Sequence, residues 1–352
     1  MLMFTLLVSA LKPGMILWDD VYSLSNDLLL RANCVLDDDK IQILVDNQIS
    51  EVDLKSADDI GTTQFERINR NSDFKRFSAI HEDGVATSKR LIKNLAANMP
   101  VKLSAFEVIT DSILETVRSD GQLLDFITNM LSNEYEMTYT HCVNSALLCH
   151  IFGTWLGYSK ETIDTLMLCG FLYDIGKTQL PEELIWKSGQ LTSDERLQIR
   201  RHIHLGYDML KGKELPPHVI TTLVMHHERA DGSGYPAGLK ASKIDTYALF
   251  IAIVDSFEAM THPRANRPAL TAFQAIRNFE SEGFYKYGES MIKPILTHVA
   301  KNYINCEVML NNNLAGQIIE IHEDNLSRPT ILCENLSFDI RMYPDVEIVR
   351  IL

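Results

Sequence analysis

The segment VMHHERADGSGYPAGL, residues 224–239, places two adjacent histidines directly before a loop rich in glycine. The apolar residues that precede it have helical spacing, so His226 and His227 are expected to end a helix. The glycines and the proline that follow predict a loop whose backbone can approach a bound group closely. This pattern indicates a ligand site rather than a packed core position.

Histidines and carboxylates gather in the same third of the chain. Eight of the eleven histidines fall between His141 and His262. Asp255 lies inside the apolar run ALFIAIVDSF, where a buried carboxylate needs a cation or several hydrogen-bond donors. Taken alone, His141 on an amphipathic helix is more typical of a hydrogen-bonded surface histidine. As a set, imidazoles and carboxylates are the ligands that Mn, Fe, Ni or Zn take when thiolates are absent, and they predict a metal site.

Composition limits the other possibilities. With 352 residues, 46% of them hydrophobic, the chain can form two or three compact units with real cores. The net charge of -14 argues against a general affinity for nucleic acid or an anionic membrane. An anionic small ligand therefore needs a local basic pocket. Six cysteines without a CxxC pair are expected to be free thiols in a reducing compartment.

The N-terminal run MLMFTLLVSA is apolar but short, and it lacks a basic flank. We expect a buried strand there, with a signal peptide as the alternative. No other stretch reaches the length of a membrane span, so a soluble cytoplasmic protein with no membrane partner is expected.

The hydrophobic pattern changes along the chain. Apolar runs broken by turn residues predict strands before residue 60, including one over residues 41–54, and again after residue 302. Between them, apolar positions repeat at three and four and predict helices. We therefore predict a mainly α protein. Its expected parts are a small α/β or β-rich N-terminal domain (1–60), a helical connector (61–130), a helical domain (131–300) and a small β-rich C-terminal unit (301–352).

The segment HHERADGSGYPAGL closely resembles the signature of the HD-GYP family, bacterial phosphodiesterases that hydrolyse cyclic di-GMP. The other matching pieces follow in the family's order over roughly residues 130–290: YTH (139–141), YDIGK (173–177), HIHLG (202–206) and EAMTHPRANR (258–267). The resemblance implies an all-helical HD-type metal-dependent phosphohydrolase core, flanked here by the two small β-rich units.

The resemblance also implies two divalent metal ions bridged by Asp174, with Fe or Mn expected and Ni or Zn as alternatives. His202 is chosen over His204 because the family's histidine stands four residues before a glycine, here Gly206. Members with a third metal carry a glutamate where this chain has Met137, so no third ion is expected. The implied ligands are His202, His226 and His227 in one site, and His141 and Asp255 in the other.

The implied catalytic residues are Asp174 and Lys177, whose ammonium would hold a phosphate oxygen one helical turn away. Gly234 and Tyr235 would border the substrate, although Tyr235 fits a purely structural role as well. Arg264 would hold the phosphate or the guanine, with a solvated loop charge as its alternative. The family usually has an aromatic and a basic residue after this arginine, and their absence here predicts fewer substrate contacts.

Tyr173 is the main departure, because the family has a histidine ligand there. A phenol ligates weakly near neutral pH, since its ordinary pKa is about 10. Tyr173 therefore either serves as a phenolate ligand to a ferric ion, or leaves a water-filled gap or a displaced metal, so that only one ion binds.

Two functions remain open. One is a phosphodiesterase that cuts cyclic di-GMP to the linear dinucleotide or to GMP. The alternative is a degenerate module that binds cyclic di-GMP as a sensor. The amphipathic stretch 102–132 suits a homodimer interface as well as a core, and signalling partner proteins are expected only by family analogy.

Overall fold

The computed structural model describes residues 4–32, 34–54, 68–69, 71–130, 136–185, 187, 189–262, 269–333 and 336–352. Arg264, expected at the substrate, lies outside these residues, as do Ala265, Asn266 and Arg267. The chain divides into two compact units. One comprises Met1–Asn71, Thr271–Asn278 and Val299–Leu352, and the other comprises Ser72–Leu270 and Phe279–His298.

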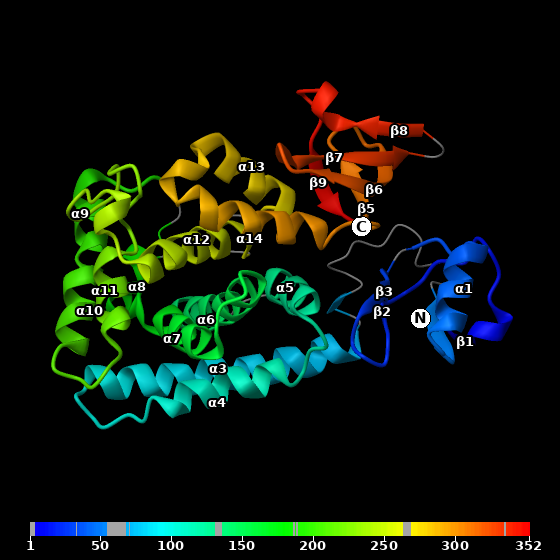
Figure 1. The fold of residues 1–352 in the computed structure, drawn as a ribbon. Helices are drawn as coiled ribbons and strands as arrows, with labels where there is room; N and C mark the ends of the chain where they lie inside the picture. The colour runs from blue at the N-terminus through cyan, green and yellow to red at the C-terminus, as the bar shows by residue number, and fades with distance from the viewer. Residues whose placement is uncertain are drawn as a thin grey trace. The chain divides into compact units, whose positions relative to one another are not determined.

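The second unit is helical, as expected (Figure 1). The helices α13 (Ala272–Glu282) and α14 (Glu289–Lys301) are divided between the two units. The helices that precede them are α3 (Ser72–Ala96), α4 (Ser104–Leu114), α5 (Asp120–Asn129), α6 (Met137–Trp155), α7 (Lys160–Leu172), α8 (Glu182–Ile185), α9 (Ser193–Arg200), α10 (His202–Leu210), α11 (Pro217–Met225) and α12 (Thr246–Thr261).

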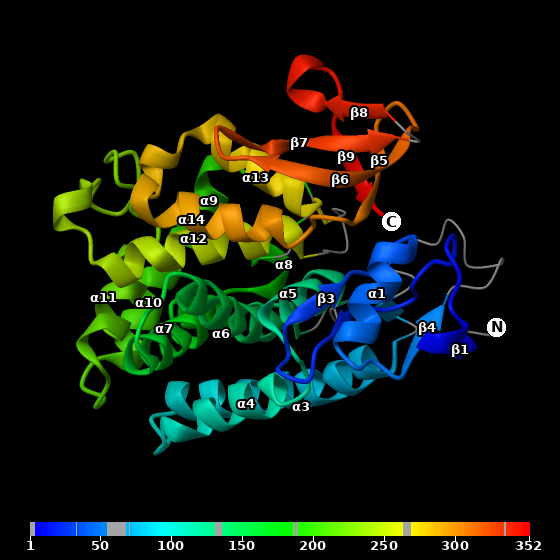
Figure 2. The same ribbon diagram turned by 45° about the vertical axis from the view of Figure 1, so that its right-hand side comes forward.

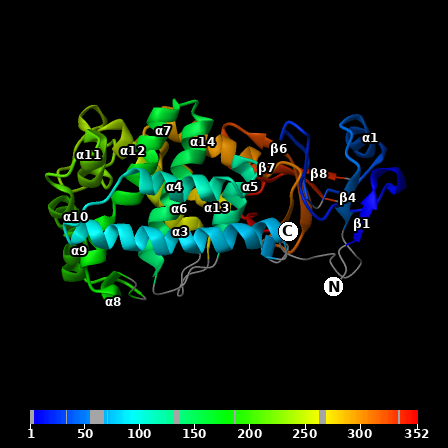
Figure 3. The same ribbon diagram turned by 90° about the horizontal axis from the view of Figure 1, so that it is seen from below.

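Helices α6 and α12 form the centre of this unit because they are apolar on nearly every side, which is the pattern of a buried helix. Helix α6 packs against both α7 and α12. Helices α3 and α4 form an antiparallel pair that packs beside α6, and Figure 1 and Figure 3 both show the pair side by side. The approach of α7 to α6 requires Gly170, since a Cβ there would lie 2.8 Å from the Ala146 Cα.

The expected helix through YDIGK is interrupted. Helix α7 ends at Leu172, and a short 3-10 helix, η4 (Ile175–Gln179), follows Asp174. Lys177 therefore lies one 3-10 turn after Asp174, not on a continuous α-helical face. Gly176 makes this turn possible: a Cβ on it would lie 1.9 Å from the His202 carbonyl oxygen. The glycine lets η4 pack directly against α10.

The N-terminal part of the other unit contains β1 (Phe4–Leu7), β2 (Val21–Tyr22), β3 (Leu28–Leu30), α1 (Asp38–Asp46) and β4 (Glu51–Leu54). Strand β1 pairs antiparallel with β4, and β2 with β3. The strand expected over residues 41–54 is wrong for its first half, which is helix α1. The Asp37 side chain accepts a hydrogen bond from the Lys40 amide and caps this helix, a local signal that outweighed the apolar run.

The strands expected after residue 302 are confirmed (Figure 2). Five antiparallel strands form one sheet in the order β8-β7-β6-β5-β9. They are β5 (Glu307–Leu310), β6 (Ala315–His322), β7 (Asn325–Cys333), β8 (Leu336–Asp339) and β9 (Ile348–Ile351). The prediction of a helical core with small β-rich ends is thus confirmed. All six cysteines are free thiols, and within the described ranges no helix is long and apolar enough to cross a membrane.

Candidate metal centre

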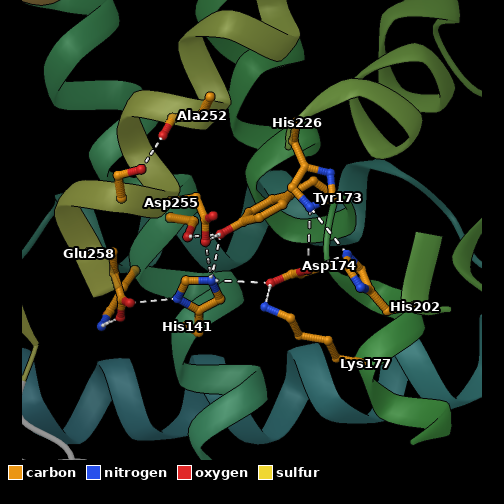
Figure 4. A network of polar contacts seen from close by, with 12 residues as sticks. His141, Tyr173, Asp174, Lys177, His202, His226, Ala252, Asp255 and Glu258 are labelled. Atoms are coloured by element: carbon orange, nitrogen blue, oxygen red, sulfur yellow. Dashed lines mark hydrogen bonds and ion pairs between the residues drawn. The ribbon is translucent and has the colours of Figure 1, made fainter. Parts of the chain in front are cut away.

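Four predicted ligands from three separate segments meet in one cluster, which we call the first cluster. Asp174 follows α7, His202 begins α10, and His226 and His227 directly follow α11. One ligand atom of each lies within 4.8 Å of the others. Figure 4 shows His202 and His226 pointing towards Asp174 from different helices. The structure thus brings these four residues together as the sequence predicted, and it leaves His204 exposed.

The histidine tautomers leave two nitrogens free to bind a cation. His202 Nδ1 donates to the Ile199 carbonyl at 2.6 Å, and His226 Nδ1 donates to the Leu223 carbonyl at 2.9 Å. In a neutral ring this hydrogen bond leaves the lone pair on Nε2, and the two Nε2 atoms lie 3.3 Å apart. Burial lowers the pKa of His202 to about 4, so its imidazole is neutral at physiological pH.

The carboxylate of Asp174 completes this cluster of acceptors. Its Oδ1 lies 3.4 Å from His202 Nε2 and 3.6 Å from His226 Nε2, yet it is buried and has no hydrogen-bond donor among the described residues. Burial opposes ionisation of Asp174, but the Lys177 ammonium, which contacts Oδ2, helps to hold its pKa well below the ordinary value. Three buried lone-pair atoms that converge without a donor are costly unless a cation lies between them.

His227 differs from the other ligands because it is half-buried and its ring stacks on Tyr235, with centroids 4.5 Å apart. Burial and the neighbouring His226 lower its pKa well below the ordinary value, so it too is neutral. The first cluster therefore consists of three imidazoles and one carboxylate. This donor set fits a borderline divalent ion such as Fe, Mn or Zn.

A second cluster contains His141, Asp174 and Asp255, as predicted. His141 Nε2 lies 3.4 Å from Asp174 Oδ2 and 3.3 Å from Asp255 Oδ1. Asp255, expected to be a buried carboxylate, keeps 14% of its side chain exposed. Although burial opposes it, the hydrogen bond from His141 helps to keep the pKa of Asp255 well below its ordinary value.

The Tyr173 hydroxyl lies among these candidate ligands. It is 2.5 Å from His141 Nε2 and 3.1 Å from both Asp255 Oδ1 and Ser145 Oγ. The side chain is 1% exposed, so the phenol oxygen is buried among the candidate ligands. Burial and the charges of Asp255 and Asp174 raise the pKa of Tyr173 well above its ordinary value, and the phenol keeps its proton.

A buried polar network behind the second cluster was not anticipated. His141 Nδ1 contacts Glu258 Oε2 at 2.5 Å, and Asn144 Nδ2 donates to Glu258 Oε1 at 3.1 Å. Asn144 Oδ1 is in turn 2.8 Å from Nε2 of His81 on α3. Burial opposes protonation of His141, but Glu258 helps to raise its pKa well above the ordinary value. Glu258 stands three residues after Asp255 in the same apolar run, a spacing that could have revealed it.

The loop after α11 is held by Glu228, another residue not anticipated. This buried carboxylate accepts hydrogen bonds from the amides of Ala237 at 2.7 Å and Leu239 at 2.8 Å. Gly234 is needed here because a Cβ would lie 2.4 Å from the Arg229 amide nitrogen. Together these contacts place Tyr235 over His227, at the edge of the first cluster.

Comparison with known families agrees with this site. Residues 125–290 match the family described as HD domain, and the chain therefore contains an HD domain. The structure of an HDG"Y"P protein from Bdellovibrio bacteriovorus aligns with a TM-score of 0.51 at 15% identity, over 84% of this chain and 99% of that one. This likeness supports the fold.

Curated relatives make the assignment more specific. The chain is 28% identical over 228 residues to a cyclic di-GMP phosphodiesterase of Pseudomonas aeruginosa, covering 64% of this chain and 54% of the relative. It is 31% identical over 173 residues to a cyclic di-GMP phosphodiesterase of Thermotoga maritima, covering 48% and 47%. A 3'3'-cGAMP-specific phosphodiesterase of Vibrio cholerae is 30% identical over 198 residues, covering 55% and 44%. The chain spans about half the length of these relatives. Together with the HD-domain match, these relatives support assignment of residues 125–290 to the HD-GYP family.

Proposed function

We propose that this chain is a metal-dependent phosphodiesterase that hydrolyses cyclic di-GMP. The observation that carries the proposal is the convergence of His202 Nε2 and His226 Nε2 on the donorless Asp174 Oδ1. The named activities of the curated relatives supply the substrate class, a cyclic dinucleotide. The products are the linear dinucleotide, GMP, or both.

Asp174, His202, His226 and His227 would hold an Fe or Mn ion. When bound, such an ion would supply Lewis acidity, lowering the pKa of bound water and offsetting negative charge on phosphate. The chain's own contribution is orientation: the backbone carbonyls of Ile199 and Leu223 fix two imidazoles so that each presents Nε2. Lys177 Nζ stands beside Asp174 with 21% of its side chain exposed, placed to donate to a phosphate oxygen.

We propose that the second cluster binds a second ion more weakly. His141, Asp174 and Asp255 supply suitable ligand atoms, but the Tyr173 hydroxyl is within hydrogen-bond distance of both His141 and Asp255. These hydrogen bonds would have to be rearranged before an ion could be bound by the same atoms. Because burial keeps the phenol protonated, the tyrosine does not replace the imidazole that the family has at this position.

The test is anaerobic turnover of cyclic di-GMP by protein loaded with Mn or Fe, with products separated chromatographically. We expect hydrolysis by the wild type, and a loss of about a hundredfold or more in Asp174→Asn, because that change weakens a residue that belongs to both clusters. Wild-type protein that binds metal and cyclic di-GMP without any turnover would contradict the proposal and indicate the degenerate binding module.

The parallel variant Tyr173→His tests the second cluster. We expect bound metal to rise from about one to about two ions per chain and turnover to increase, because an imidazole replaces a phenol that ligates poorly. Tyr173→Phe is the matched control, since it removes the hydroxyl without adding a ligand. Equal metal content in wild type and Tyr173→His would contradict the weak second site.

A further inference from the structure

Arg200, the last residue of α9, lies at the edge of the first cluster. Its guanidinium carbon is 4.3 Å from the centroid of the Tyr235 ring. The His227 ring stacks on the same tyrosine at 4.5 Å, with 26° between the planes. Two planar groups this close to one centroid cannot share a face, so Tyr235 lies between them. One aromatic ring therefore separates Arg200 from a predicted metal ligand.

The stack also limits what Tyr235 can do. With a guanidinium on one face and an imidazole on the other, neither face is free for a nucleobase. Tyr235 instead positions Arg200, because a guanidinium is attracted to the face of an aromatic ring. Of the two roles considered for Tyr235 from sequence, this geometry favours the structural one.

Arg200 keeps its hydrogen-bonding capacity for a ligand. Its side chain is exposed, and across the described ranges no carboxylate lies within ion-pair distance of it, although the chain carries a net charge of -14. Arg229, in the same loop as Tyr235, instead makes its contacts within the protein. Its guanidinium donates to the carbonyls of His226 and Glu228 and lies over the Tyr287 ring. Arg200 is thus an oriented cation beside the metal cluster.

Resting on the proposed function, we infer that Arg200 binds the phosphate of the cyclic dinucleotide that is not being cleaved. Both phosphates of such a substrate belong to one small ring, so a scissile phosphate at the first cluster brings the other close to it. The planar fork of a guanidinium pairs with two phosphate oxygens at once. Arg200 is therefore a substrate-binding residue that acts on affinity rather than on the chemical step.

The experiment compares Arg200→Ala with Arg196→Ala in the metal-loaded chain of residues 1–352. Arg196 is an exposed residue of the same helix, one turn earlier, and is the matched control. In Arg200→Ala we expect the KM for cyclic di-GMP to rise about tenfold or more, as for loss of a hydrogen bond to a charged group. We expect kcat to stay within about threefold, because the contact is made in ground and transition states alike. Arg200→Lys should recover part of the loss, since it keeps the charge without the fork.

An unchanged KM in Arg200→Ala, or an equal rise in Arg196→Ala, would overturn the inference and leave the proposed function standing. A fall in kcat with reduced bound metal would also overturn it, because Arg200 would then support the cluster itself. If the wild type binds cyclic di-GMP without cleaving it, the same comparison is made on the dissociation constant by calorimetry. Wild type that neither binds nor cleaves cyclic di-GMP overturns the proposed function, and the inference with it.

Discussion

At the scale of single residues, the first cluster depends on which nitrogen of each histidine is committed to the backbone. His202 and His226 both donate Nδ1–H to a carbonyl three residues earlier. This common hydrogen bond fixes the ring and leaves Nε2 as a lone-pair donor, which is the state that a metal ligand needs. His204 is two residues from His202 but is exposed, and it belongs to neither cluster.

We therefore predict that His202→Ala and His204→Ala behave differently. His202→Ala should lose most of the bound Mn or Fe and lower turnover about a hundredfold, because one of four ligands of the first cluster is removed. His204→Ala should keep wild-type metal content, and it serves as the matched control on the same helix. Metal is counted by plasma emission spectroscopy after dialysis. Equal metal loss in both variants would contradict the ligand assignment.

At the scale of elements, a buried polar chain joins three helices behind the second cluster. His81 on α3 contacts Asn144 on α6, and Asn144 donates to Glu258 on α12. Asn144 also lies 3.4 Å from His262 Nδ1. These side chains are buried, so each depends on its partners for hydrogen bonds, and removing one would leave another unsatisfied. The network fixes the relative position of the helices that carry His141 and Asp255.

His81 gives this network a pH dependence. Burial lowers its pKa to about 4, an effect that the Asn144 hydrogen bond and Glu258 oppose and His262 reinforces. Between that value and the ordinary value of about 6.5, the unfolded chain binds more protons than the folded one. The contribution of His81 to stability is therefore complete above pH 6.5 and is lost as the pH falls towards 4, by about 3 kcal/mol in all.

In His81→Gln, which keeps an amide donor for Asn144 but does not titrate, we expect the free energy of unfolding to fall less between pH 7 and pH 5 than in the wild type. The measurement is urea denaturation of metal-free protein, followed by the circular dichroism signal of its helices. Comparing the change with pH, rather than absolute stability, removes the effect of the substitution itself. Identical pH dependence in the two proteins would show that His81 does not titrate in this range.

At the scale of the whole molecule, both clusters belong to one of the two compact units. Every described ligand of either cluster lies within Ser72–Leu270. The other unit has its own apolar core, which includes Leu17, Leu36 and Leu44. A compact unit with its own core can unfold separately, so bound metal should stabilise one unit only.

Two tryptophans report on the units separately, because Trp18 belongs to one unit and Trp155 to the other. We expect Mn at about 100 times its dissociation constant to raise the free energy of unfolding reported by Trp155 by about 2.7 kcal/mol. The value reported by Trp18 should not change. Each reporter is studied alone, with the other tryptophan and Trp186 replaced by phenylalanine, in guanidinium titrations monitored by fluorescence. Equal shifts at both reporters would show that the units unfold together.

The sequence by itself determined the helical core, the β-rich ends and the identity of the ligand-type residues. These features follow from local patterns: apolar spacing for the helices, histidine and aspartate beside glycine-rich turns for the clusters. One local pattern gave a wrong prediction. The apolar run at residues 41–46 resembles a strand but belongs to helix α1, whose N-terminus is capped by Asp37.

Only the tertiary structure decided how these residues act together. His202 Nε2 and His226 Nε2 lie 3.3 Å apart although the two residues are 24 positions apart in the sequence. The Tyr173 hydroxyl reaches His141 and Asp255, which lie on α6 and α12. The Tyr235 ring lies between Arg200, which precedes α10 in the sequence, and His227, which follows it. The contacts of the Tyr173 hydroxyl, for example, join residues 32 and 82 positions apart. No period in the sequence encodes them, because they arise from how the helices pack.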